Sequence, residues 1–303
     1  MNPVEYAERY RNLTIQANGQ TKNNLRVEIY RIGKPDDEQG KLWQDLKDHF
    51  RTAKKKDASY AITLLVNGSQ ERFDSSDKLL RHVVNPFWGK GSPEDCQIAL
   101  SVAVLLGRTT MARVQTYAKD HVGLDCNGFV GNYLWRERLQ NAWKLHPGKD
   151  EVPAPSANIA AIVKWAADKS KESGAVVDKV EDLDSERMYL MAMVDGNLKV
   201  IPGGPNSPSG HIVITQPKRY MAKSFTWDSM GFYDLGMAKK DAYGHPAYWA
   251  VESTGPEMQL GLRESWYAIR VLRNKKKEPI PGIFDVYRGS KAASLKFRIV
   301  PVP

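Results

Sequence analysis

The fold and the candidate chemistry depend on residues 124–130, which read Leu-Asp-Cys-Asn-Gly-Phe-Val. After Cys126, apolar or aromatic side chains recur at a helical spacing, at Phe129, Val130, Tyr133 and Leu134. This spacing predicts an amphipathic helix that begins at Cys126 and carries the thiol on its buried side. Asp125 is then the expected N-cap residue, and Gly128 in the first turn leaves room for a substrate backbone.

A thiol at the start of a helix can act as a nucleophile. Unpaired backbone N–H groups and the positive end of the helix dipole stabilise the thiolate and lower the thiol pKa. The alternative is that Cys126 is a small buried apolar residue of a core helix, as most free cysteines are. Cys96 is interpreted in that second way, because it lies among the apolar residues of another predicted helix.

A thiol nucleophile needs a base, and histidine titrates close enough to neutrality to serve. Of the six histidines, His211 is best placed, at the start of the predicted strand 211–215 and after a Gly/Pro-rich turn. His121, five residues before Cys126, is the competing candidate. A second predicted strand, 247–253, carries Glu252 near its end, and an aromatic-rich insertion over 220–243 lies between the two strands.

Length and composition describe a globular protein of about two domains, with 303 residues and 42% hydrophobic content. The longest apolar run, 98–106, is shorter than the roughly 20 residues of a membrane-spanning helix, so no stable membrane insertion is expected. The net charge of +9 favours an anionic partner such as a wall polymer. The basic clusters 54–56 and 273–277 lack interleaved aromatics, so they are interpreted as solvated turns and no nucleic-acid partner is expected.

The domain organisation is read from a Gly/Pro-rich junction at 85–93. We expect an N-terminal α/β domain of unknown role over 1–90 and a catalytic domain over 91–303. The first should contain a strand over 25–32, a helix around 42–50 and a strand over 60–66 that ends in an Asn-Gly turn. The second should begin with a helix over 93–106 capped by Ser92, followed by helices over 109–119 and 158–170 and several strands within 175–200.

The segment around Cys126 resembles the nucleophile motif of the NlpC-type cell-wall peptidases, a family of the papain-like cysteine peptidases. In that family Asp-Cys-Ser-Gly-Phe opens the central helix, and here Asn127 stands in place of the serine. The family's base is a histidine that starts a strand, which His211 matches. Its third residue, usually His, Asn or Gln on the next strand, corresponds to Glu252. The resemblance implies an α+β, papain-like fold in which the cysteine-bearing helix packs on an antiparallel sheet.

The resemblance also implies a cysteine peptidase or amidase that hydrolyses amide bonds in peptidoglycan stem peptides. Its catalytic residues would be Cys126, His211 and Glu252, with the Cys126 N–H helping to bind the oxyanion. Tyr117 would supply the hydroxyl that the family draws from a lead-in tyrosine absent here. The substrate-binding residues expected with it are Asp125, Asn127, Gly128 and Trp227. Trp227, with Phe232 and Tyr233 of the insertion, either lines the cleft or packs over the sheet.

Two other classes of function stay open. The same residues could run deamidation, acyl transfer or proteolysis on an intracellular protein, or the domain could be a non-catalytic wall-binding module. No metal or cofactor is expected, because the sequence has no His-Glu-x-x-His, Cys-x-x-Cys or Gly-rich phosphate motif. No signal peptide is recognisable, so a wall substrate implies synthesis in the cytoplasm and export by a signal-independent route. An antibacterial effector or a lysin would fit, with a secretion machinery or an immunity protein as partner.

Overall fold

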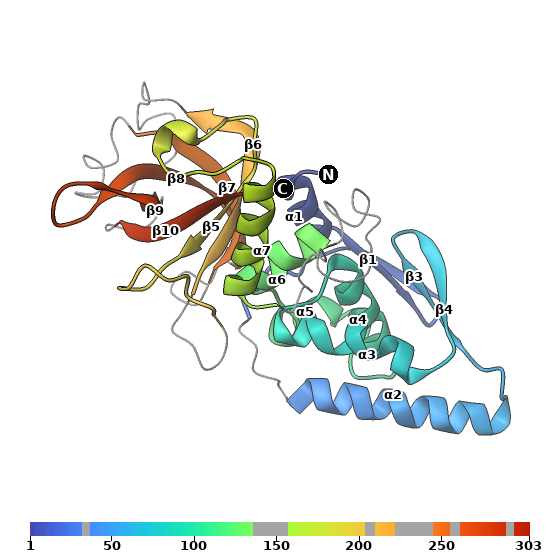
Figure 1. Ribbon diagram of the computed structural model, residues 1–303. Coiled ribbons are helices and arrows are strands. Elements are labelled where there is room, and N and C mark those ends of the chain that lie inside the picture. Colours follow the sequence, from blue (N-terminus) through green and yellow to red (C-terminus); the bar gives the residue numbers. More distant parts are fainter. Residues whose placement is uncertain (32–36, 136–156, 204–209, 222–244, 255–260, 289–293) are drawn as a thin grey trace. The chain divides into compact units, whose positions relative to one another are not determined.

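The computed structural model describes residues 1–31, 37–135, 157–203, 210–221, 245–254, 261–288 and 294–303 (Figure 1). The chain forms two compact units. The first comprises Met1–Val4, Tyr133–Glu252 and Arg263–Pro303, and the second comprises Glu5–Asn132 and Ser253–Leu262. The chain passes from one unit to the other after Val4, Asn132, Glu252 and Leu262. Helix α4 (Pro93–Leu105), which follows the Gly/Pro-rich junction where the domain boundary was predicted, packs on elements that precede that junction.

Helix α4 is the centre of the second unit. Its residues from Pro93 to Val104 are all buried, which is typical of a helix enclosed on every side. It packs against β1 (Leu13–Ala17), β3 (Ile62–Val66) and α3 (Ser76–Val84). A capping box fixes its start, since the Ser92 hydroxyl accepts the Asp95 N–H and the Asp95 side chain accepts the Ser92 N–H. The predicted helix over 93–106 and its cap are thus confirmed.

The remaining elements of the second unit surround α4. Two hairpins pair β1 with β2 (Gln20–Leu25) and β3 with β4 (Ser69–Phe73). The helical elements are α1 (Pro3–Arg11), α2 (Asp37–Lys56), the short η1 (Asn85–Trp88), α5 (Val114–His121) and α6 (Cys126–Asn132). The predicted strand over 25–32 is wrong. Strand β2 ends at Leu25, and among the described residues 26–31 only Tyr30 makes a β-bridge, with Leu124.

The first unit contains a closed barrel of six strands in the order β10-β5-β6-β7-β8-β9 (Figure 1). The strands are β5 (Tyr189–Met193), β6 (Ile212–Met221), β7 (Ala247–Thr254), β8 (Gly261–Arg273), β9 (Pro279–Arg288) and β10 (Leu295–Pro301). Strand β10 pairs antiparallel with both β5 and β9, and that double pairing closes the sheet. The strands expected near 211–215 and 247–253 are present, whereas 175–200 contains one strand, β5, among the described residues.

Alternate side chains of the barrel strands form its core. The buried cluster contains Met191, Val213, Tyr248, Ile269 and Phe284, among others. Helix α7 (Ile159–Glu172) packs on β10 and β5, and Asn158 caps it by accepting the Ala161 N–H at 2.9 Å. A 3-10 turn, η3 (Val180–Asp182), follows α7. The predicted helix over 158–170 is therefore confirmed, and the antiparallel sheet expected for the histidine and the glutamate is a barrel.

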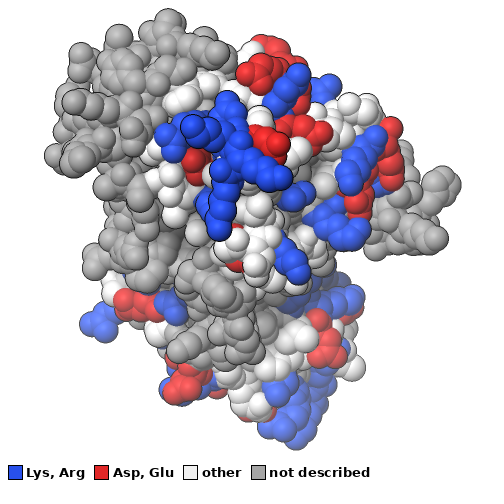
Figure 2. All heavy atoms as spheres, turned by 60° about the vertical axis from the view of Figure 1, so that its left-hand side comes forward, with Lys and Arg blue, Asp and Glu red and all other residues white. Residues whose placement is uncertain are grey.

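Charge is distributed over the surface in mixed groups. On the face drawn in Figure 2, Lys and Arg side chains lie in several clusters with Asp and Glu between them. The interspersed signs reduce the field that the net charge of +9 would otherwise produce close to that face. In the part of the chain that the structure describes, no helix is long and apolar enough to cross a membrane.

Candidate active site

Cys126 is the first residue of α6, as the sequence predicts, and is 3% exposed. Asp125 caps the helix, because its Oδ1 accepts the Gly128 N–H at 2.5 Å. Phe129 and Val130 on the same helix are fully buried. The thiol is therefore placed at the helix end where backbone N–H groups favour a thiolate.

Lys90 holds the polar side chains on both sides of Cys126. Its Nζ forms an ion pair with Asp125 Oδ2 at 2.5 Å and also donates to Asn127 Oδ1. Burial raises the pKa of the Asp125 carboxyl, and the Lys90 ammonium opposes that rise. Asp125 and Asn127 thus fix the geometry of the helix start; contact of either residue with a substrate stays a prediction.

Gly128 is required by a close crossing of two backbone segments. A Cβ at this position would lie 2.0 Å from the carbonyl oxygen of Gly89. Gly89 itself has φ +74°, in the left-handed region, and its carbonyl accepts the Asp125 N–H at 3.0 Å. On this side of Gly128 the chain's own backbone occupies the room that was predicted for a substrate backbone.

Tyr30 is a member of the Cys126 group that sequence reasoning missed. Its hydroxyl is hydrogen-bonded to the Cys126 side chain. The pKa of the Tyr30 hydroxyl is raised, first by burial and then by the charges of Cys126 and Asp125, so it remains a phenol at neutral pH. A phenol O–H that donates to sulfur stabilises the thiolate. The Tyr30 bridge with Leu124 holds it there.

Tyr117, predicted to supply such a hydroxyl, makes a different contact. Its hydroxyl donates to Glu38 Oε1 at 3.1 Å, and its ring lies 4.8 Å from that of His121. Arg108 pairs with the same glutamate, and this hydrogen-bonded ion pair lowers the Glu38 pKa. The hydroxyl bonded to Cys126 is that of Tyr30. The substrate-binding role of Tyr117 stays a prediction. His121, the alternative base, belongs to the Tyr117 cluster.

The second thiol has a different environment. Cys96 is fully buried within α4. Burial raises its pKa well above the ordinary value, and the neighbouring carboxylates Asp95 and Glu94 raise it further. It therefore remains a protonated core thiol, in agreement with its place among the apolar residues of the sequence.

His211 and Glu252 lie together in the first unit. Strand β6 begins one residue later than predicted, so His211 immediately precedes it, and Glu252 is on the neighbouring strand β7. His211 Nε2 and Glu252 Oε2 are 2.5 Å apart, and both residues are buried. The structure thus brings together the two residues that the sequence pairs as base and orienting group.

Two side chains from β8, absent from the sequence prediction, hold the other oxygen of Glu252. Arg263 donates from Nε at 2.7 Å and forms an ion pair through Nη2, also at 2.7 Å. Ser265 Oγ donates to the same Oε1 at 3.2 Å. The Glu252 side chain has 0% exposure, so the cation compensates a charge removed from water. The array His211–Glu252–Arg263 therefore has a carboxylate fixed at both oxygens.

The other expectations concern metals and the aromatic insertion. Trp227, Phe232 and Tyr233 lie outside the described residues, so their predicted place in a cleft stays a prediction. Among the described residues, no group of three or more His, Cys, Asp or Glu side chains could hold a metal ion.

No protein-family model, curated protein or solved structure matches the chain. The likeness to the NlpC-type peptidases thus rests on the residues around Cys126 and His211.

Proposed function

We propose that the protein is a cysteine hydrolase of amide bonds, with Cys126 as the nucleophile and His211 as its base. The observation that carries the proposal is the His211–Glu252 contact of 2.5 Å, with Glu252 fully buried and anchored by Arg263. A carboxylate held in this way fixes the imidazole ring and stabilises its charged form. The hydrogen bond between Tyr30 and Cys126 at the start of α6 supports the assignment of the nucleophile.

The proposed reaction follows from these roles. Cys126 Sγ bonds to the amide carbonyl carbon while His211 takes the thiol proton. The C–N bond then breaks, His211 returns the proton to the leaving amine, and a thioester remains on Cys126. Water, deprotonated by His211, hydrolyses the thioester and restores the thiol. Backbone N–H groups at the start of α6 supply donors for the developing oxyanion.

We propose peptidoglycan stem peptides as the substrate, because the segment 123–130 resembles the nucleophile motif of wall peptidases. A wall substrate would further require export of the protein, and we propose a secretion machinery or an immunity protein as its partner. Incubation of the protein with soluble peptidoglycan fragments, followed by mass spectrometry, tests this. Cleaved stem peptides from wild type and Cys96→Ala, but not from folded Cys126→Ala, are the expected result.

The rival functions give other results in the same assay. Retention of intact fragments by the wild type and by Cys126→Ala alike would indicate a binding module. An unchanged fragment pool, combined with cysteine-dependent toxicity when the protein is confined to the bacterial cytoplasm, would indicate action on an intracellular protein.

Whether His211 acts on Cys126 is tested separately through thiol chemistry. The rate of alkylation of Cys126 is measured against pH in the wild type and in His211→Ala. If His211 is the base, loss of its imidazolium moves the half-maximal rate to higher pH, because the thiolate loses a stabilising cation. An unchanged profile in a folded His211→Ala protein would contradict the assignment.

A further inference from the structure

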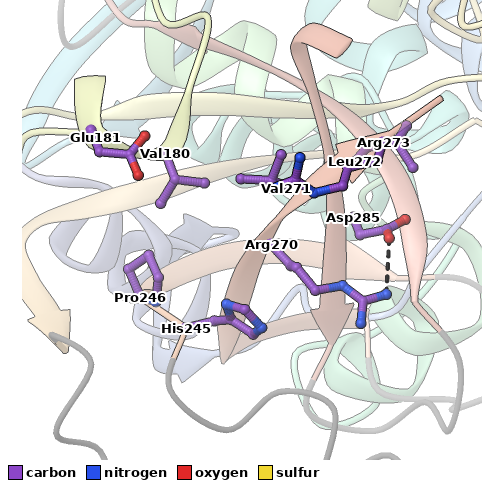
Figure 3. A pocket seen from close by; sticks show the side chains of 9 residues that line it. All are labelled: Val180, Glu181, His245, Pro246, Arg270, Val271, Leu272, Arg273 and Asp285. Carbon is purple, nitrogen blue, oxygen red and sulfur yellow. Dashed lines mark hydrogen bonds and ion pairs between the residues drawn. The ribbon is translucent and has the colours of Figure 1, made fainter. Parts of the chain in front are cut away.

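A cavity of about 610 Å³ lies in the first unit beside the end of strand β8, and none of the residues assigned to chemistry lines it (Figure 3). Its volume is in the range of small-molecule sites. The lining comprises Val180, Glu181, His245, Pro246, the four residues 270–273, and Asp285. The cavity thus combines apolar walls with charges of both signs.

An irregularity of strand β8 builds one wall. Alternating side chains of a regular strand face opposite sides, yet the four consecutive residues 270–273 all line this cavity. The pairing of β8 with β9 shifts register between Val271 and Arg273, as a β-bulge does, and a bulge redirects side chains. Bulges of this kind are common beside functional sites.

One charged pair in the wall is already satisfied. Arg270 bonds to Asp285 at 3.0 Å, and its guanidinium lies 5.1 Å from the centre of the Tyr287 ring. These contacts hold Arg270 rigid and balance its charge. The charges that remain for a ligand are those of Arg273 and Glu181.

Arg273 and Glu181 come from separate elements, β8 and η3, and Figure 3 shows them on opposite sides of the cavity. Within the described part of the chain, neither side chain forms an ion pair. Arg273 donates one N–H to the carbonyl of Lys277 at 2.8 Å, which fixes it against the turn. A guanidinium has five N–H donors, so this bond leaves capacity for a carboxylate.

We propose that this cavity binds a zwitterionic ligand of dipeptide size, with its carboxylate at Arg273 and its ammonium at Glu181. The side chains of Val180, Val271 and Leu272 offer apolar contact to the carbon atoms between the two charges. A ligand with a single charge would satisfy one side of the cavity only. The proposal does not rest on the proposed hydrolase function, since the cavity residues are separate from the Cys126 and His211 groups.

The probe is the dipeptide alanyl-alanine, titrated into the full-length protein and followed by heteronuclear NMR. The Cys126→Ala background is used, so that turnover cannot remove the probe. Two analogues each lack one charge: the N-acetylated dipeptide keeps the carboxylate, and the dipeptide amide keeps the ammonium. We expect each to bind about 1.5- to 5-fold more weakly than alanyl-alanine, the range of a partly exposed ion pair.

Variants assign the two ends. Arg273→Gln should weaken alanyl-alanine and the acetylated analogue by about the same factor and leave the amide unaffected. Glu181→Gln should weaken alanyl-alanine and the dipeptide amide by about the same factor and leave the acetylated analogue unaffected. Lys276→Gln is the matched control, because it removes one charge from the same turn outside the cavity. The proposal is overturned if the three probes bind equally, if alanyl-alanine does not bind, or if Lys276→Gln weakens binding as much as Arg273→Gln.

Discussion

Replacement of Arg263 by methionine should destabilise the protein strongly, because it would leave the Glu252 carboxylate buried without its guanidinium. The Glu252 side chain is 0% exposed and that of Arg263 only 15% exposed, so water can do little to replace the lost partner. Removal of one member of such a buried pair typically costs about 3–5 kcal/mol. Arg263→Met should therefore lower the free energy of unfolding by about that amount at pH 7, measured by urea denaturation.

The matched control is Arg270→Met on the same strand. Arg270 also pairs with a carboxylate, Asp285, but the two side chains are 35% and 15% exposed. Partly exposed pairs contribute about 0–1 kcal/mol, so Arg270→Met should cost much less. The double variant Glu252→Gln with Arg263→Met should recover stability relative to Arg263→Met, since no buried charge remains to be compensated.

A loss below about 1 kcal/mol at pH 7, or a double variant no more stable than Arg263→Met, would refute the electrostatic account of this array.

The remaining predictions concern the cysteine group and the place of action. A thiol reagent should label Cys126 before Cys96, because the raised pKa and the burial of Cys96 keep that thiol unreactive. Mass spectrometry of protein digests measures the order of labelling, and preferential labelling of Cys96 would contradict the assignment. Tyr30→Phe should raise the pH of half-maximal alkylation of Cys126 by about one to two units, since a hydrogen bond to a charged group contributes about 1.5–3 kcal/mol. An unchanged pH profile would exclude a role of Tyr30 in stabilising the thiolate. Lys90→Met should lower the free energy of unfolding by about 3 kcal/mol, because it leaves the buried Asp125 carboxylate without its cation. Thermal or urea unfolding measures this loss. Expression in bacteria should cause lysis only when wild-type protein, and not Cys126→Ala, carries an added periplasmic signal; lysis or toxicity confined to the cytoplasmic form would refute the wall substrate.

The helices that could be predicted have local signals. Helix α4 begins at a Ser-Pro-Glu-Asp capping sequence, α7 begins at Asn158, and α6 begins after Asp125, each followed by a suitable apolar pattern. These features act within a few residues of one another, so the sequence displays them directly. The barrel has no such signal, because its closure depends on β10 pairing with both β5 and β9.

The candidate site shows the same distinction between local and distant contacts. His211 and Glu252 were predictable because each lies at the end of a recognisable strand, beside a turn-rich segment or an insertion. Tyr30 and Lys90 reach the Cys126 segment through backbone bridges to Leu124 that join distant parts of the chain. The only local mark of either residue is the Gly-Lys-Gly sequence around Lys90, at 89–91. This sequence reads as a domain junction and gives no sign of the carboxylate that Lys90 binds.

Arg263 also accounts for one of the polar residues at which the sequence departs from its resemblance. The wall peptidases usually place a neutral His, Asn or Gln where this chain has Glu252. A neutral group can be buried beside an imidazole with hydrogen bonds alone, but a carboxylate also needs compensation of its charge. Arg263, eleven residues further on, supplies that cation to Oε1 while Oε2 remains with His211. The glutamate and the arginine therefore form one buried ion pair whose members depend on each other. We expect Glu252→Gln to retain more of the proposed hydrolase activity than Arg263→Met, since the glutamine keeps an acceptor for the imidazole N–H and leaves no buried carboxylate unpaired.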